Sequence, residues 1–136
     1  MREELLKLAE RVEQLSGPDR EVDALIWLEV TPGATRKETR FIHKASGKEQ
    51  IIDETRDASR RLIIVPNYTA SLDAAMALVP EGCDVMMGRP PARRRVNQIW
   101  AQVWDARTSE TRNESVGCNL AAALCAAALR ALAKEK

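Results

Sequence analysis

The sequence has little of the material from which most metal and redox sites are built. Among its 136 residues only His43 is a histidine, and the three cysteines are an odd number with no Cys-x-x-Cys pair. A zinc site needs several such ligands, and a disulfide framework needs paired cysteines. We therefore expect no metal, no cofactor and no disulfide, and we expect Cys83, Cys118 and Cys125 to be small buried hydrophobic residues in a reducing compartment.

Long apolar runs and an excess of charge of one sign are also missing. The longest strictly apolar stretch, LAAALCAAAL, has 10 residues, and the first residues, MREELLKLAERVEQL, are charged throughout. Neither segment is typical of a membrane span or of a secretory signal. The 21 Lys and Arg residues nearly balance the 20 Asp and Glu residues, so no global field attracts polyanions. We expect a cytoplasmic protein that has no membrane partner.

The composition that remains is typical of one folded domain. Hydrophobic residues make up 45% of the chain and charged residues 30%, which excludes the disordered and membrane classes. The length suits one hydrophobic core and hardly two. The sequence therefore predicts a single domain over residues 1–136.

Two amphipathic helices are predicted at the N-terminus. Apolar residues recur there at spacings of three and four, which predicts a helix over 2–15. The turn Ser16-Gly17-Pro18-Asp19 ends this helix and caps a second one over 20–29. The apolar stripe of the first helix could also pair with a second copy, so a homo-oligomer stays open. The stripe consists of Leu5, Leu8, Val12 and Leu15.

The middle of the chain, from Arg36 to Arg61, is strongly charged. The stretches TRFIHK and EQIID are separated by Ala45-Ser46-Gly47, a pattern that predicts an exposed hairpin. The following LIIVP, residues 62–66, is either a further strand or the apolar lead-in to the next helix.

The stretch YTASLDAAMALVPEG, residues 68–82, predicts a capped helix. Asn67 or Thr69 is expected to cap it, and Leu72, Met76 and Val79, with Ala75, are expected to form its apolar stripe.

Two strands and a last helix complete the prediction. CDVMMG and the alternating VNQIWAQVWD should pair as a hairpin, and ARTSETRNES should be a polar linker. The Ala-rich segment 119–134 predicts a helix packed centrally on the sheet. The fold class is therefore α+β, with helices packed on a small antiparallel β-sheet as in an α-β-α sandwich and with the order ααββ(β)αββα.

The loop GRPPARRR is the sharpest charge feature of the sequence. Arginines beside aromatic residues on a strand are typical of single-strand nucleic-acid binding, although a short charge run in a loop is usually only solvated. The candidate binding residues are Arg89, Arg93, Arg94, Arg95, Trp100 and Trp104.

A second candidate site is a group of polar residues near predicted helix starts. Asp23 and Asp73 could supply paired carboxylates for acid–base chemistry, but residues at helix starts suit capping equally well. His43 alone offers an imidazole for catalysis, without a patterned partner. The polar cluster consists of Asp23, Tyr68, Thr69, Ser71 and Asp73.

Three stretches of the chain carry a resemblance to a known family. GPDREVDALI (17–26), YTASLDAAMALVPEG (68–82) and NLAAALCAAALRALA (119–133) resemble, in order and wording, motifs of the phage ABA-sandwich domain family of bacteriophages and prophages. The resemblance implies helices packed about an antiparallel sheet, and it implies no activity.

The leading hypothesis is a non-enzymatic phage or prophage accessory protein that acts in the cytoplasm of the host bacterium by binding a phage or host protein. It rests on a complete scaffold without assembled chemistry. Two alternatives stay open: a nucleic-acid-binding module that uses the arginine loop 89–95, and a small enzyme or ligand-binding domain built on Asp23, Tyr68 and Asp73.

Overall fold

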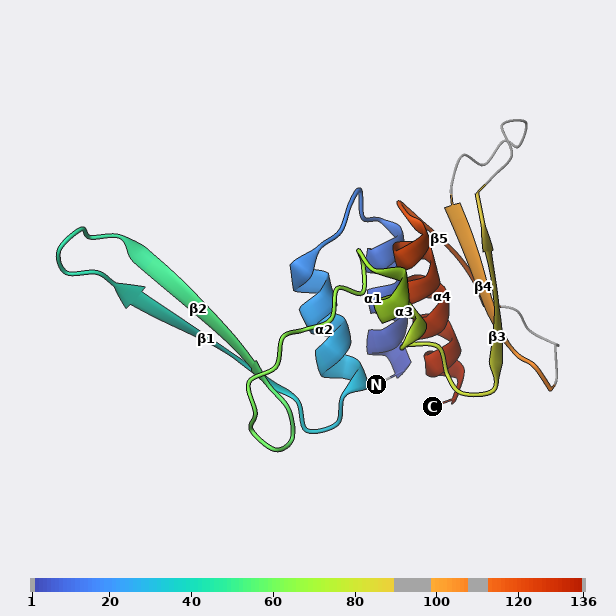
Figure 1. Cartoon of the computed structure of the whole chain (residues 1–136), viewed down its shortest axis with the longest axis horizontal. Coiled ribbons are helices and arrows are strands. Elements are labelled where there is room, and N and C mark those ends of the chain that lie inside the picture. Colours follow the sequence, from blue (N-terminus) through green and yellow to red (C-terminus); the bar gives the residue numbers. More distant parts are fainter. Residues whose placement is uncertain (1, 90–98, 108–112, 136) are drawn as a thin grey trace.

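The computed structural model describes residues 2–89, 99–107 and 113–135. A helical body packs on a three-stranded sheet, and a two-stranded arm projects from the body (Figure 1). The elements are α1 (Arg2–Glu13), α2 (Arg20–Val30), β1 (Thr35–Ile42), β2 (Glu49–Arg56), α3 (Leu72–Met76), β3 (Cys83–Gly88), β4 (Ile99–Asp105), β5 (Asn113–Gly117) and α4 (Leu120–Glu135).

Helix α4 is the centre of the body. It lies between α1 and the sheet β3-β4-β5, and every residue from 121 to 129 is buried. Most of these residues are alanines, whose small side chains let neighbouring backbones approach from several sides, while Leu124 and Leu129 fill the remaining space. The predicted central placement of this helix is confirmed.

The sheet turns one face toward α4. Strand β4 pairs antiparallel with β3 and with β5, and Ala101 and Val103 are buried on the side that α4 covers. The pairing of Val85 with Val103 confirms the predicted hairpin. Because side chains alternate along a strand, Trp100 and Trp104 lie on the opposite face, where no described helix covers them.

Strand β5 was not predicted. The segment 106–115 was expected to be a polar linker, but Asn113–Gly117 forms the third strand. Its inward positions carry Ser115 and Gly117, which are small enough to lie against α4. A Cβ atom on Gly117 would come within 2.5 Å of the Ala123 nitrogen, so only glycine fits without movement of the helix. The linker prediction is wrong for this part because the strand has almost no hydrophobic pattern.

Polar contacts of α4 join the elements that lie on its two sides. Arg130 donates from Nε to the Ser115 hydroxyl at 3.0 Å and also pairs with Glu13. One α4 side chain therefore links β5 to α1.

The first two helices agree closely with prediction. Helix α1 buries Leu5, Ala9 and Val12 and ends at Glu13, two residues before the predicted end. Asp19 caps α2 by accepting from the backbone N–H groups of its first turn, as predicted.

The predicted cap of the third helix is wrong, and its predicted stripe is only partly right. The cap is Ser71, and the helix has only five residues; Ala75 is buried and Val79 packs against the core, but Leu72 and Met76 are exposed. The Thr69 hydroxyl does not cap α3: it accepts from the Asp19 N–H and donates to Asp23 instead.

The α+β class and most of the element order are confirmed. The differences are the added β5 and residues 62–66, which form no strand and only a single bridge between Leu62 and Arg56. None of the described helices combines the length and the apolar character needed to cross a membrane.

The expectation that all three cysteines are buried is wrong. Cys125 in α4 is buried, Cys83 is partly buried and Cys118 is exposed. Cys118 lies two residues before α4 begins, so it is outside the packed part of the helix.

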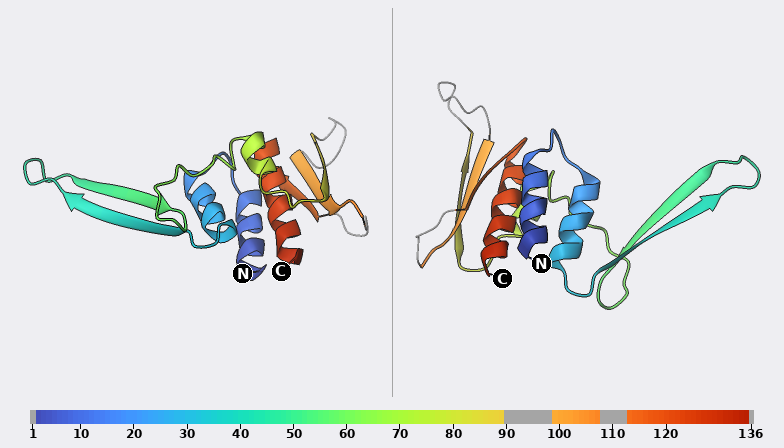
Figure 2. Two further views of the ribbon diagram at one scale, coloured as in Figure 1. Left: turned by 60° about the horizontal axis from the view of Figure 1, so that its bottom comes forward. Right: turned by 180° about the vertical axis from the view of Figure 1, so that it is seen from behind.

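The predicted hairpin is confirmed and is longer than predicted. Strands β1 and β2 pair over eight residues each, from Thr35 opposite Arg56 to Ile42 opposite Glu49. Both views in Figure 2 show this arm extending from the base of α2 away from the rest of the chain. We call residues 35–56 the arm.

Candidate interaction surface

The polar cluster is assembled around a buried carboxylate. Asp23 of α2 is fully buried, and its Oδ1 accepts hydrogen bonds from the backbone N–H and the hydroxyl of Thr69, each at 2.8 Å. Its Oδ2 pairs with the Arg20 guanidinium at 3.1 Å. The carboxylate is therefore fully partnered inside the protein.

Thr69 is the point at which three elements meet. Its hydroxyl accepts from the backbone N–H of Asp19 at 2.9 Å, and its carbonyl accepts from the Asn119 side chain at 3.1 Å. The other side-chain atom of Asn119 accepts from Ala122 and so caps α4. These bonds hold the start of α2 and the start of α4 to the segment before α3.

The other members of the polar cluster have separate roles. Tyr68 is buried, burial raises its pKa, and its carbonyl accepts from the Cys125 thiol at 2.9 Å. Burial likewise raises the pKa of Cys125. Ser71 caps α3, and Asp73 is exposed on that helix.

The cluster is thus a structural junction in which Asp23 and Thr69 meet. Asp23 is fully buried whereas Asp73 is exposed on α3, and neither carboxylate lines the clefts of about 320, 450 and 390 Å³ found among the described residues. The paired carboxylates that acid–base chemistry would need are not brought together here.

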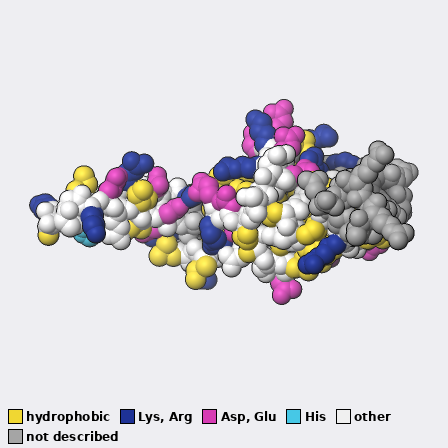
Figure 3. Space-filling view, turned by 90° about the horizontal axis from the view of Figure 1, so that it is seen from above, with side chains coloured by type: hydrophobic (Ala, Val, Ile, Leu, Met, Phe, Trp, Pro, Cys, Tyr) yellow, Lys and Arg dark blue, Asp and Glu magenta, His cyan; other side chains and the backbone are white. Residues whose placement is uncertain are grey.

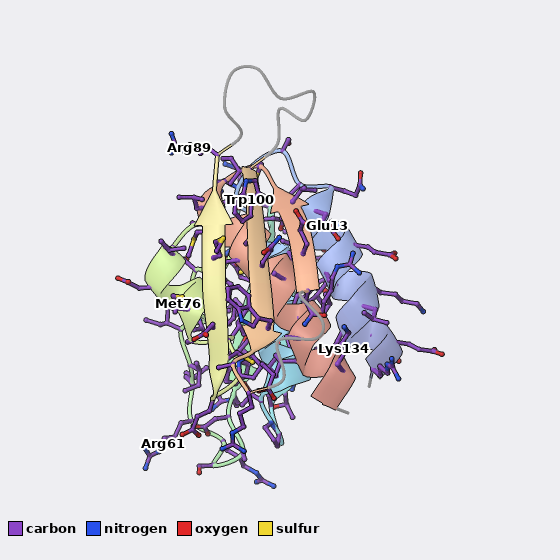
Figure 4. The ribbon with its side chains drawn as sticks, turned by 90° about the vertical axis from the view of Figure 1, so that its right-hand side faces the viewer. Glu13, Arg61, Met76, Arg89, Trp100 and Lys134 are labelled. Atoms are coloured by element: carbon purple, nitrogen blue, oxygen red, sulfur yellow. The ribbon has the colours of Figure 1, made fainter. Side chains whose placement is uncertain are left out.

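The arginine loop is placed only in part. Arg93, Arg94 and Arg95 lie outside the described residues, so the nucleic-acid interpretation of this loop stays a prediction. Arg89 is exposed at the end of β3 (Figure 4). It lines a cleft of about 450 Å³ beside the start of α4. Trp100 lies on the uncovered face of the sheet against Gly88, where an added Cβ would come within 3.0 Å of the indole ring.

His43 lies beyond the end of β1, at the tip of the arm. It is exposed, and its Nε2 is 2.8 Å from the Gln50 side-chain oxygen. Within residues 2–89, 99–107 and 113–135, no three His, Cys, Asp or Glu residues are grouped as a metal site requires.

Several large apolar side chains of the arm are exposed to solvent. Phe41 is 48% exposed, Ile42 74% and Ile51 52%, although a two-stranded sheet alone in water is only marginally stable. Cross-strand pairing puts Phe41 and Ile52 on one face and Ile42 and Ile51 on the other. Figure 3 shows hydrophobic side chains standing among charged ones along the arm.

The two edges of the arm differ. The base of β2 is covered by the following segment, since Ile63 donates its backbone N–H to the Thr55 carbonyl at 2.9 Å. Among the described strands none pairs with the outer edge of β1. An exposed strand edge of this kind is a template for pairing with another chain.

A charged clamp fixes the base of the arm to α2. Arg36 of β1 bonds to both carboxylate oxygens of Glu21 in α2, at 2.9 and 2.6 Å, and to Asp53 of β2. These hydrogen bonds lower the pKa values of Glu21 and Asp53 and raise the pKa of Arg36. The three side chains line a cleft of about 320 Å³ between arm and body.

The sequence predicts that the arm is an exposed hairpin, but the arm is not among the candidate sites named from the sequence. The sequence feature that could have indicated a binding surface is a pair of short strands with apolar residues on both faces and charges between them. If only one face of the hairpin were packed on the body, the apolar residues would be confined to that face.

An apolar depression lies between α1 and α2. It has a volume of about 390 Å³, and Leu8, Leu25 and Leu28 form its floor between charged side chains. Unlike the arm, it lies within the packed body, between two helices that contact each other.

Comparison with known proteins returned no match to a family model, to a curated protein or to a solved structure. The resemblance to the phage ABA-sandwich family therefore stays a prediction from the three sequence stretches.

Proposed function

We propose that this protein is a non-enzymatic interaction domain of a phage or prophage, which acts in the host cytoplasm and binds another protein chain through the arm. The observation that carries this proposal is the arm itself. It projects from a body that has its own core, and it offers exposed apolar side chains and an unpaired strand edge. Exposed apolar patches and open strand edges are typical features of protein-binding surfaces.

The clamp at the base of the arm supports the same function. Arg36 holds the arm in one orientation through its bonds to Glu21 and Asp53, so little freedom is lost when a partner binds. A merely solvated loop would need no such fixed base.

The polar cluster supports a non-enzymatic protein by its position. Asp23 is the candidate general base of the cluster, but it is buried, and its two carboxylate oxygens are bonded to Thr69 and Arg20. A general base must be within reach of a substrate proton, and this carboxylate is enclosed by its own structural partners.

A photo-crosslinking experiment tests the proposed function. The photoreactive residue p-benzoylphenylalanine replaces Phe41 on the arm or, as a matched control, Met76 on α3, which is 43% exposed against 48% for Phe41. The full chain is expressed in bacterial cells and irradiated, and the products are identified by mass spectrometry. We expect discrete adducts to a protein chain from position 41 and not from position 76. Equal yields from the two positions, or none from the arm, would contradict the proposal.

A further inference from the structure

We propose that the outer edge of β1 pairs antiparallel with the β1 of a second copy of this chain, about a two-fold axis at Thr39, so that two arms form one four-stranded sheet. This inference rests on the proposed function, because it names the partner of the same arm. It follows from backbone geometry and from the order of charges along β1.

The backbone geometry limits the registers that are available. His43 donates its N–H to the Lys48 carbonyl across the arm, and these positions continue the register in which Phe41 is opposite Gln50. Odd-numbered residues of β1 are therefore hydrogen-bonded to β2, and even-numbered ones point N–H and C=O outward. The bond from Ile63 to Thr55, the cross-strand partner of Arg36, agrees with this alternation. A second strand must then place even residues opposite even residues.

The charges select one of these registers. When Glu38 is opposite Arg40 of the second copy, the two-fold axis creates this opposite-charge pair twice. A register centred on Glu38 places glutamate opposite glutamate, and one centred on Arg40 places arginine opposite arginine, which destabilises a sheet. Registers centred farther from Thr39 pair fewer residues of the two strands. The register centred on Lys37 also places lysine opposite lysine.

The other pairs in the selected register are compatible as well. Thr39 meets Thr39 of the second copy on the axis, a favourable cross-strand pair. Phe41 lies opposite Lys37, whose stem can cover the ring and whose ammonium group is attracted by it. Each Ile42 reaches the position opposite Arg36, so the tip of one arm lies at the base of the other.

The two charged residues are available for this contact. Glu38 is directly opposite Asp53 within its own arm, Arg36 already neutralises Asp53, and Glu38 makes no ion pair with any described residue. Among the described residues Arg40 forms one ion pair, an exposed contact of 3.7 Å with Glu49, and a pair of this kind contributes little to stability.

The paired surface is small, so the dimer is expected to be weak and to depend on concentration. A single pair of eight-residue strands lies at the low end of protein interface sizes. Sedimentation equilibrium over about 10 μM to about 1 mM therefore covers the relevant range.

A charge-swap experiment tests the pairing. In E38R both β1 positions are basic, and in R40E both are acidic, so each variant replaces two attractive pairs with two repulsive ones. We expect the dissociation constant of each variant alone to rise about 10- to 100-fold. An equimolar mixture of E38R with R40E restores opposite charges across the axis, so we expect it to form a heterodimer near wild-type affinity. Such a recovery also shows that both variants fold.

A disulfide experiment tests the register. In a C118S background, which removes the exposed native thiol, T39C should form an intermolecular disulfide under mild oxidation, because residues opposite each other in a non-hydrogen-bonded pair have Cα atoms about 4.5 Å apart. K37C is the matched control. Its side chain is more exposed than that of Thr39, yet in this register two Lys37 positions lie far apart. Oxidation of K37C as fast as T39C would overturn the proposed register.

The outcomes separate this inference from the proposed function. If the wild type is monomeric up to about 1 mM and the mixed variants do not associate, the self-pairing is wrong. Crosslinking from position 41 to a different protein would then leave the proposed function standing. If the arm neither self-associates nor crosslinks to any chain, both proposals are wrong.

Discussion

The body and the arm of this protein are built from opposite materials. In α4 every residue from 121 to 129 is buried and most are alanine, whereas every residue of β1 is exposed or half-exposed, and its charged residues are followed by the apolar pair Phe41 and Ile42. The body therefore completes its own contacts, while the arm leaves apolar side chains exposed and a strand edge that no described strand pairs with. In the proposed function, the body supplies the stability and the arm binds another chain.

Two sets of polar contacts meet at the start of α2, one within the body and one to the arm. Asp23 and Thr69 anchor the start of α2 to the body, and Arg36 anchors the arm to the same helix start through Glu21. The first turn of α2 therefore contacts both the rest of the body and the arm, and it fixes the direction in which the arm projects.

The largest expected effect comes from breaking the buried junction. Asp23→Ala should lower the free energy of unfolding by about 3 to 5 kcal/mol, because it leaves the Thr69 N–H without an acceptor, the Thr69 hydroxyl with only the long 3.4 Å bond to the Asp19 carbonyl, and Arg20 without its ion pair. Urea unfolding measures the change. Asp73→Ala, at an exposed aspartate, is the control and should cost less than about 1 kcal/mol. Equal costs for the two variants would contradict the structural role of Asp23.

The contrast between core and arm is tested by two truncations. Leu124→Ala should cost about 2 to 5 kcal/mol, because the side chain is fully buried and α4 cannot collapse around the cavity. Ile51→Ala on the arm should change the free energy of unfolding by about 0.5 kcal/mol or less, because this side chain is half-exposed. Both are measured at low protein concentration by thermal and urea unfolding. A large loss at Ile51 would mean that the arm is part of the core.

A smaller effect is expected at the contact between β5 and α4. Gly117→Ala places a Cβ against the backbone of Ala122 and Ala123 and should cost about 1 to 3 kcal/mol through overpacking. Gly17→Ala is the matched control, because no atom lies within 4 Å of the added Cβ. If both substitutions are neutral, β5 does not lie against α4 as described.

The smallest effect is the dependence of the clamp on pH. Arg36 lowers the pKa values of Glu21 and Asp53 below their ordinary 4.5 and 3.8. Lowered carboxylate pKa values stabilise the folded state above the ordinary pKa, and this contribution is lost as the pH falls through the lowered values. NMR signals at the base of the arm should therefore shift below about pH 4 while α4 signals stay constant. In Arg36→Gln this acid-dependent shift should move toward the ordinary pKa values; an unchanged titration would show that Arg36 does not hold the carboxylates.

The parts of the fold that hydrophobic periodicity marks could be predicted from the sequence. The spacing of apolar residues predicts the buried stripe of α1, the alternation in β4 and the Ala-rich helix α4. Strand β5 was missed because NESVG contains one apolar side chain, Val116, and its inward residues are small and polar.

The candidate sites were harder to predict because their contacts are long-range. Asp23 and Thr69 are 46 residues apart, and their types suit capping as well as chemistry. The exposed character of the arm was visible in its composition, but its direction depends on Arg36 and Glu21, 15 residues apart, whose contact no local pattern encodes.

Amide hydrogen exchange at two protein concentrations tests the division between body and arm most directly. In a single chain the outward N–H groups of Glu38 and Arg40 are unbonded, the Thr39 N–H is bonded to β2, and the amides within α4 are buried. We predict that exchange at Glu38 and Arg40 slows as the concentration rises from about 10 μM to about 1 mM, while Thr39 and α4 are unchanged. Exchange at Glu38 and Arg40 that stays fast at every concentration, or α4 amides that respond instead, would contradict the account.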